Sequence, residues 1–304
     1  MVSVLCAMRS ERLMKSLTGL SVWEFVSLEP AFCNLLLVDK WGKYFDGLLK
    51  RVPGGGRKSS SLESGRAKLF FVLFYLKCYS TFDVLGFFFD LNKSNANRWV
   101  HRLLGVLEKS LGRKLVLPRR KIRSVEEFFR LFPEAKEVFI DGTERPIQRP
   151  KDKEKQKENY SGKKKAHEQK NLVICDKKKR IGYLSPTHDG REHDYGIFKE
   201  EMPPDALPGE IFCYMDKGFI GINTDYPGLR VEMPKKKPKG GELTPKEKEE
   251  NKRISSIRIL VEHAIGGFKR FRIMTDKFRN KKTGLIDKAA LISAGLWNLH
   301  IDTC

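Results

Sequence analysis

Three carboxylates occupy settings in which acidic side chains can hold divalent metal ions. Asp141 closes the apolar run 138–140 and Asp216 closes the run 211–215, so each aspartate is predicted at the end of a strand. Glu262 lies within the amphipathic helical pattern RILVEHAIGGFKRF. Mg²⁺ prefers such hard oxygen ligands and leaves positions for water and phosphate oxygens. Two such ions about 4 Å apart activate an attacking oxygen and stabilise the leaving one, so the pattern predicts metal-dependent phosphodiester chemistry.

Each carboxylate also has an ordinary structural interpretation. Asp141-Gly142 is a common turn dipeptide, and Asp216 followed by Lys217-Gly218 equally suits a turn. Glu262 can pair with Arg258, which lies four residues earlier on the same helix. The helix pattern favours a functional role, because its apolar stripe, 257–268, leaves three charged residues on the opposite face: Arg258, Glu262 and Lys269.

The charge balance favours a polyanionic partner. The 304 residues include 59 Lys and Arg against 38 Asp and Glu, for a formal charge of +21. Such an excess raises the local concentration of nucleic acid and steers its association. No apolar run is long enough to span a bilayer, and charges at residues 9–12 interrupt any signal-peptide core, so we expect no membrane partner. Six scattered cysteines without a CxxC pair are typical of a reducing cytoplasm, and we expect a cytoplasmic, nucleoid-associated protein.

The segment 80–107 has the layout of a helix-turn-helix. A short helix over 81–89 is followed by a break at 90–93, and Ser94 is the expected N-cap of a second helix. The apolar side chains of that helix recur at helical spacing. Its other face carries the candidate DNA-binding residues Asn95, Asn97, Arg98, His101 and Arg102. Asn pairs with adenine and Arg with guanine or phosphate, whereas the alternative is an ordinary helical hairpin with a solvated polar face.

The basic connector 118–124 separates two expected domains. Residues 1–120 are predicted to be a helical DNA-binding domain, and residues 121–304 an α/β domain with strands near 137–140, 172–175, 181–184 and 211–215. Two stretches of the second domain are strongly cationic, 149–170 and 235–252. The first lies beside Asp141 and is the better candidate for contacting phosphate, whereas most of the second is expected to be a solvated loop.

The segments DGTERPIQRP, MDKGF and R-x-x-x-E-x-x-x-x-x-x-K, in this order, resemble the DDE-type transposases of bacterial insertion sequences, specifically the insertion-sequence-five group. The resemblance covers nearly the whole chain, since GRAKLFFVLFYLKCY and LNKSNANRWVHRLL are similar to that group's N-terminal helical region. One departure is Ser255, where the family often has Tyr three residues before the Arg.

The resemblance implies a ribonuclease-H-like catalytic core, a mixed sheet with flanking helices. In such a core Asp141 lies on the first strand, Asp216 just after the fourth, and Glu262 on a later helix. The three residues would hold two Mg²⁺ or Mn²⁺ ions, cut the element's terminal inverted repeats and join them to double-stranded target DNA, with a homodimer in the synaptic complex. Arg258 and Lys269 match the basic positions that flank the family's glutamate.

Two rival interpretations remain open at this point. A protein that keeps the fold and binds DNA without cutting it would act as a repressor of its own element. Alternatively, the two His-Asp dipeptides in THDGREHD, at 188–189 and 193–194, could bind a transition metal in a metallophosphohydrolase. Against the second, a loop with a helix cap at Asp194 explains the same residues.

Overall fold

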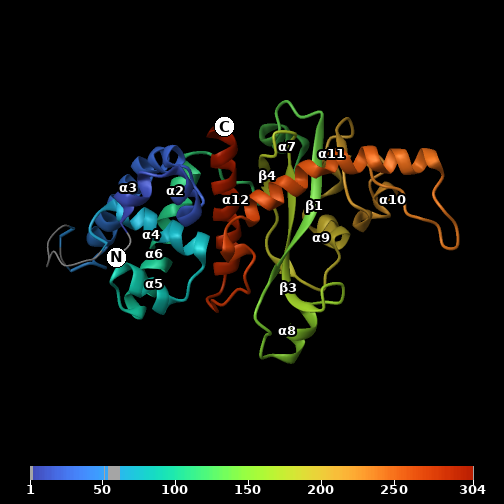
Figure 1. Cartoon of the computed structure of the whole chain (residues 1–304). Coiled ribbons are helices and arrows are strands. Elements are labelled where there is room, and N and C mark those ends of the chain that lie inside the picture. Colours follow the sequence, from blue (N-terminus) through green and yellow to red (C-terminus); the bar gives the residue numbers. More distant parts are fainter. Residues whose placement is uncertain (1–2, 51, 54–61, 304) are drawn as a thin grey trace. The chain divides into compact units, whose positions relative to one another are not determined.

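The computed structural model describes residues 3–50, 52–53 and 62–303. The described residues form two compact units (Figure 1). One contains the described part of Met1–Leu117 together with Lys269–Asp276 and the segment from Lys282, and the other contains Pro118–Phe268 and Lys277–Lys281. Among the described helices no single one is long and apolar enough to cross a membrane; the consecutive pair Glu11–Thr18 and Val22–Phe45, bent by 55°, passes on length and composition alone.

The first unit is entirely helical. It contains α1 (Val4–Met8), α2 (Glu11–Thr18), α3 (Val22–Phe45), α4 (Gly65–Cys78), α5 (Phe82–Phe89), α6 (Lys93–Arg113), the 3-10 turn η3 (Arg272–Met274) and α12 (Leu285–Thr303). Polar side chains start these helices, as in the capping box of Ser21 and Glu24 at α3. The centre of the unit is α4, in which every side chain from Lys68 to Leu76 is buried.

The C-terminal helix belongs to this helical unit. Asn298 of α12 donates a hydrogen bond to the Val116 carbonyl at 2.8 Å, and Lys288 pairs with Glu108 of α6 at 2.7 Å. Leu117 and Leu111 pack against the Cα of Gly295. The compact units therefore differ from the predicted segments 1–120 and 121–304, because the chain returns to the first unit after the second. The division of function between residues 1–120 and residues 121–304 remains a prediction.

The predicted helix-turn-helix consists of α5, a tight turn and α6. Asp90 ends α5 with a φ of 52°, and Gly86 is required because a Cβ there would lie 2.4 Å from the Leu91 carbonyl oxygen. The N-cap of α6 is Asn92, whose side chain accepts a hydrogen bond from the Asn95 N–H at 2.8 Å. The prediction of Ser94 as the N-cap was therefore wrong. The side chain of Asn92 accepts from the N–H three residues later, so the helix starts two residues earlier than expected.

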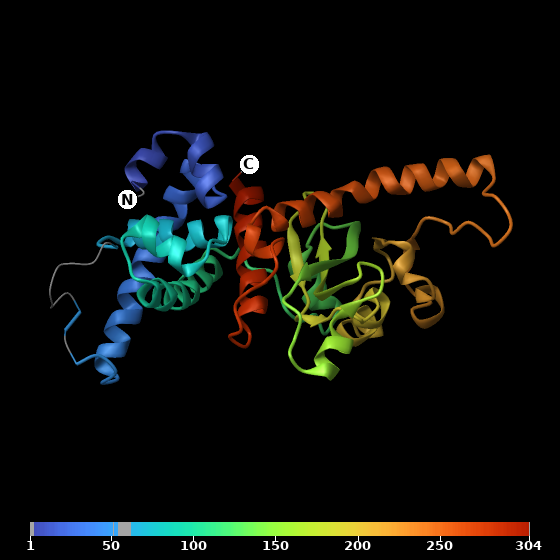
Figure 2. The same cartoon turned by 60° about the horizontal axis from the view of Figure 1, so that its bottom comes forward.

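The second unit is a seven-stranded mixed sheet with helices (Figures 1 and 2). Its strands are β1 (Glu137–Pro146), β2 (Tyr160–Ser161), β3 (Ala166–Cys175), β4 (Ile181–Leu184), β5 (His188–Asp189), β6 (Phe212–Tyr214) and β7 (Arg230–Glu232). They are arranged in the order β2-β3-β1-β6-β7, with β4 and β5 also paired to β3. The helical elements are α7 (Val125–Leu131), α8 (Lys153–Glu158), α9 (Asp194–Glu201), η1 (Pro204–Ala206), η2 (Lys217–Phe219), α10 (Ile222–Asp225) and α11 (Pro245–Lys269).

Alternation along β1 sends side chains to two different faces. Val138 and Ile140 join a core with Phe128 of α7 and Phe198 of α9. Phe139 points the other way and stacks on Tyr214, with ring centroids 5.3 Å apart. This is the predicted ribonuclease-H-like mixed sheet with flanking helices, preceded by the helical helix-turn-helix region, and the fold prediction is confirmed.

The helix α11 begins earlier than the sequence indicated. It starts at Pro245, so the second half of the cationic stretch 235–252 is helical and not a solvated loop. Figure 2 shows its N-terminal half extending past the strands as one continuous helix. Thr244 and Glu247 stabilise this start, because the Glu247 carboxylate accepts from the Thr244 N–H and the Thr244 hydroxyl accepts from the Glu247 N–H.

Candidate active site

Two neighbouring parallel strands bring Asp141 and Asp216 together. β1 and β6 pair in parallel with Phe139 opposite Tyr214, and each aspartate lies two residues beyond its member of that pair. Because side chains alternate, both carboxylates are placed on the face of the stacked rings. Asp216 lies just past the end of β6, as predicted. Asp141 was expected to close its strand, but β1 continues to Pro146 through antiparallel pairing with β3, which excludes the turn interpretation of Asp141-Gly142.

The cation between these carboxylates is Arg258 of α11. Its Nη1 lies 3.2 Å from Asp216 Oδ1, and its Nη2 lies 3.4 Å from Asp141 Oδ2. The Arg258 side chain is only 9% exposed, because it lies on the buried side of α11 with Ile254. The predicted helix face was therefore wrong for Arg258. Its guanidinium reaches the two strands and not Glu262, since two carboxylates at the sheet compensate its charge better than one exposed neighbour.

Glu262 lies one helical turn beyond Arg258, about 6 Å along the axis at 1.5 Å per residue. Its side chain is exposed, unlike that of Arg258. Ser255 is also exposed on α11, so the position where the family often has Tyr carries no ring here. Lys269 is the last residue of α11, is half-buried, and is grouped with the helical unit.

Burial dominates the electrostatics of Asp141. It raises the pKa of this carboxyl to about 6, and the Asp216 and Asp194 carboxylates act in the same direction. Arg258 and the Gly142 N–H, which donates to Asp141 Oδ1 at 2.8 Å, lower the pKa. A negative charge on Asp141 therefore depends on a nearby cation.

The residues at this point fit a divalent metal ion. Asp141 and Asp216 offer the hard oxygen donors that Mg²⁺ and Mn²⁺ prefer, and both already face one cation. The guanidinium of Arg258 stands in for the positive charge that a metal would supply. Glu262 is exposed one turn further along α11 and is not among the groups that hydrogen-bond or pair with the two aspartates.

Asp194 is a carboxylate of this neighbourhood that sequence reasoning assigned to a helix cap. The N-cap of α9 is instead His193, and Asp194 is the first helical residue. A Cβ at Gly142 would lie 2.6 Å from Asp194 Cγ, so the absence of a side chain at 142 makes room for this carboxylate. Lys170 of β3 pairs with Asp194 at 3.1 Å and holds it in place. Two features of the sequence could have indicated this proximity: the glycine that follows Asp141 and the His-Asp dipeptide at 193–194.

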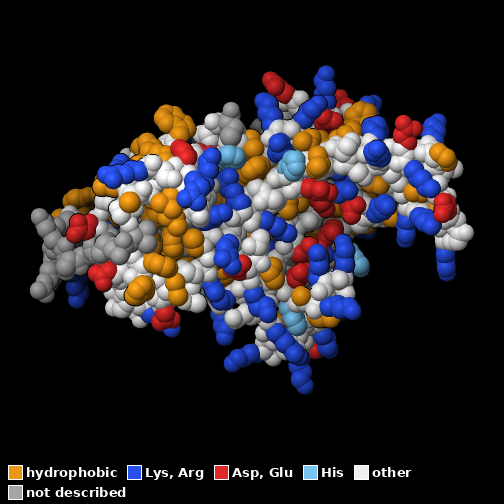
Figure 3. Space-filling model, viewed as in Figure 1, with side chains coloured by type: hydrophobic (Ala, Val, Ile, Leu, Met, Phe, Trp, Pro, Cys, Tyr) orange, Lys and Arg blue, Asp and Glu red, His pale blue; other side chains and the backbone are white. Residues whose placement is uncertain are grey.

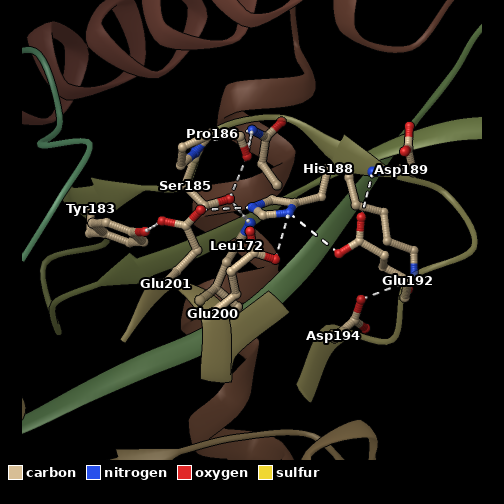
Figure 4. Close-up of polar contacts among 12 residues, drawn as sticks. Leu172, Tyr183, Ser185, Pro186, His188, Asp189, Glu192, Asp194, Glu200 and Glu201 are labelled. Atoms are coloured by element: carbon tan, nitrogen blue, oxygen red, sulfur yellow. Dashed lines mark hydrogen bonds and ion pairs between the residues drawn. The ribbon is translucent and has the colours of Figure 1, made fainter. Parts of the chain in front are cut away.

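The two His-Asp dipeptides do not form one site. His188 contacts neither Asp194 nor His193, and His193 is exposed at the start of α9. The imidazole of His188 instead faces three glutamates (Figure 4): Glu192, Glu200 and Glu201. Sequence reasoning missed them, because they come from a loop and from the last turn of α9. The rival grouping of the two dipeptides is therefore not formed, and the fold instead brings the last turn of α9 to β5.

The candidate DNA-binding residues of α6 fall into two groups. Arg98 is exposed, and Asn95 and Asn97 are half-buried near the N-terminal end of the helix. His101 and Arg102 instead line a groove of about 540 Å³ together with α3. Arg102 pairs there with Asp39 at 3.3 Å. Arg98 is therefore the most exposed of the five candidates near the start of α6, whereas Arg102 already pairs with Asp39 within the protein.

Basic side chains are concentrated near α8 in the second unit. Exposed lysines flank this helix and the turn before β3: Lys151, Lys153, Lys155, Lys157, Lys163, Lys164 and Lys165. Figure 3 shows Lys and Arg side chains gathered over this end of the unit. The strands β1 and β3 flank this segment in the sequence and pair with each other up to Asp141, which lies opposite Val173.

Comparison with known proteins identifies the family. Residues 140–298 match the model of the DDE superfamily endonuclease, and residues 60–113 match the helix-turn-helix of DDE superfamily endonuclease. The chain therefore belongs to the DDE superfamily endonucleases, metal-dependent enzymes that act on DNA. It is also 32% identical over 253 residues, which are 83% of this chain and 85% of the relative, to the probable transposase for insertion sequence element IS702 from Microchaete diplosiphon. No solved structure matches the chain significantly.

Proposed function

We propose that this protein is a transposase that binds the ends of an insertion sequence, cuts them, and joins them to target DNA with two divalent metal ions. The observation that carries the proposal is the convergence of Asp141 and Asp216 on one buried cation, Arg258, at adjacent parallel strands. The similarity to a probable insertion-sequence transposase over most of both chains supports the same conclusion.

In this proposal Asp141, Asp216 and Glu262 hold two Mg²⁺ or Mn²⁺ ions. Bound ions of this kind activate a water or a DNA 3′ hydroxyl and stabilise the leaving oxygen. A bound metal would take over the positive charge that Arg258 now supplies to the two aspartates, and the guanidinium would then be available to a DNA phosphate. Lys269 adds a second cation on the same helix, and such positioned cations stabilise charge that develops on the phosphodiester.

Recognition of the element ends is assigned to the helix-turn-helix. The exposed Arg98 near the N-terminal end of α6 is the best placed to read a base, with Asn95 and Asn97 beside it. The lysines around α8 supply contacts to the DNA backbone independent of sequence. We further propose a homodimer that synapses two ends, and association with the nucleoid through the net charge of +21.

The test is cleavage of DNA that carries the element's own terminal repeats, with Mg²⁺ or Mn²⁺. Asp216→Asn should abolish cutting and leave DNA binding intact, because the metal site lies away from α6 in sequence and in unit. The matched control is Asp225→Asn, which changes an exposed aspartate that pairs with Lys199 at 3.2 Å. Full cleavage by Asp216→Asn would remove this residue from the site.

The same assay separates the enzyme from a repressor. Wild-type protein that binds element ends specifically but neither nicks them nor joins pre-cleaved ends, in single-turnover reactions with either metal, would establish the repressor.

A further inference from the structure

A cluster centred on His188 joins β5 to the loop before α9 and to the last turn of that helix. His188 comes from β5, Glu192 from the loop before α9, and Glu200 and Glu201 from the last turn of α9 (Figure 4). The His188 side chain is 8% exposed, whereas that of Glu200 is 66% exposed. The imidazole is therefore buried, and one side of the cluster is open to solvent.

One imidazole nitrogen is fixed by a chain of hydrogen bonds. His188 Nε2 lies 2.9 Å from Glu201 Oε1, and Glu201 Oε2 accepts a hydrogen bond from the Tyr183 hydroxyl at 2.9 Å. Tyr183 is fully buried in β4. Because Glu201 is an acceptor, the proton of neutral His188 lies on Nε2 and the lone pair on Nδ1. Histidines that bind metals almost always donate their other ring N–H to a carboxylate, a backbone carbonyl or water, and here a carboxylate fills that role.

The other nitrogen faces two carboxylates at a spacing suited to a metal. His188 Nδ1 lies 3.4 Å from Glu192 Oε2 and 3.8 Å from Glu200 Oε2. Both separations exceed the usual hydrogen-bond range of about 2.7–3.2 Å. Ligands on a tetrahedral ion with bonds of about 2.0–2.1 Å lie about 3.3–3.5 Å apart. One ligand atom from each residue lies within 4.8 Å of the others, so small rotations of the glutamates complete the geometry.

We propose that His188 Nδ1, Glu192 and Glu200 bind one transition-metal dication, with Zn²⁺ favoured and water in the fourth position. An imidazole nitrogen combined with carboxylates selects such an ion over Mg²⁺, which prefers oxygen alone. The site is separate from Asp141 and Asp216 and goes beyond the proposed function. The ion ties β5 to the end of α9, the helix whose first residue rests on Gly142.

A proton competes with the metal at Nδ1. Burial lowers the pKa of His188, but the Glu201 hydrogen bond and the Glu192, Glu201 and Glu200 carboxylates raise it by more. Lys170 of β3, which pairs opposite His188, donates to the Glu192 carbonyl at 2.8 Å and to Asp194. Both imidazole nitrogens therefore face carboxylates, and a dication bound at Nδ1 would take the place of a proton there.

The experiment uses the full chain carrying Asp216→Asn, which disables the proposed catalytic metal site. Equilibrium dialysis with Co²⁺, followed by competition with Zn²⁺, measures stoichiometry, and the visible spectrum of Co²⁺ reports four-coordinate geometry. We expect one tightly bound ion per chain. His188→Gln should lower the affinity at least about 100-fold, and Glu201→Gln about 10- to 100-fold, by removing the carboxylate behind the imidazole.

Two further variants keep the result interpretable. His193→Gln changes an exposed histidine five residues away and should leave binding unchanged. Glu192→Gln changes a partly exposed ligand, so it should weaken binding even if His188→Gln fails to fold. Binding that survives both His188→Gln and Glu192→Gln, or that is absent from the parent protein, would overturn the proposed site without affecting the proposed function.

Discussion

Arg258 offers the sharpest test of the site, because it is the one cation seen between Asp141 and Asp216 among the described residues. Arg258→Gln removes the charge and leaves two carboxylates facing each other. We expect a loss of stability in the metal-free protein and a recovery when Mn²⁺ is added, since the ion replaces the missing charge. The variant should also bind Mn²⁺ more tightly than the wild type, because no guanidinium has to be displaced.

The size of the effect follows from burial. Breaking a buried ion pair typically costs about 3–5 kcal/mol, because the remaining charge is left uncompensated. Asp216 is 45% exposed and is partly solvated without Arg258, whereas the Asp141 side chain is 21% exposed. We therefore expect a loss of about 2–3 kcal/mol without metal. If about 2 kcal/mol of this returns on metal binding, the Mn²⁺ affinity of the variant exceeds that of the wild type roughly 30-fold.

The assay must report on the α/β unit alone. Cys175 of β3 and Cys213 of β6 are buried beside β1, so labelling of these two thiols, resolved by peptide from the cysteines of the helical unit, follows the unfolding of this sheet in increasing urea. The control is Arg253→Gln, on the same helix, whose pair with Glu232 at 2.8 Å is 51% exposed on the arginine side. Exposed pairs contribute at most about 1 kcal/mol, and this loss should not respond to Mn²⁺. Equal losses in the two variants, or no rescue of Arg258→Gln by Mn²⁺, would refute the reasoning.

Four other predictions follow from single features. Gly142→Ala should slow cleavage with DNA binding retained, because its Cβ would meet Asp194 Cγ at 2.6 Å and displace that carboxylate beside Asp141. Gly162→Ala, with no atom within 4 Å, should cleave normally. In EDTA the free energy of unfolding measured with urea should fall by about 2–3 kcal/mol as pH rises from about 4 to 6. The reason is that the pKa of Asp141 is about 3.9 in the unfolded chain and about 6 in the folded one, and Asp141→Asn should remove this pH dependence. Arg98→Ala should reduce discrimination between element ends and random duplex if Arg98 reads a base, or soften the salt dependence by about one unit of slope if it contacts phosphate; unchanged binding would exclude both. Lys269→Ala should slow strand cleavage at saturating DNA, and an unaltered single-turnover rate would argue against its role.

Local patterns in the sequence indicated the main helices and strands and the family. The apolar runs before Asp141 and Asp216 indicated two strands, because a strand pattern extends over only a few residues; Asp216 follows the end of β6, whereas β1 continues past Asp141 to Pro146. The helical spacing around Glu262 indicated α11, and 81–107 indicated the two helices of the helix-turn-helix. The ordered motifs then indicated the family, which the comparisons confirm.

The tertiary structure decided which residues meet. The face of α11 that carries Arg258 is buried because two aspartates from other segments compensate its charge, which helical spacing alone does not reveal. Asp194 reaches Gly142, and the glutamates of α9 reach His188, only because β3 pairs with both β1 and β5. The return of α12 to the helical unit likewise depends on contacts with α6 far away in sequence. Composition and periodicity describe neighbours along the chain, whereas strand register and helix packing set distances between residues far apart in it, and these contacts hold the two aspartates against one cation.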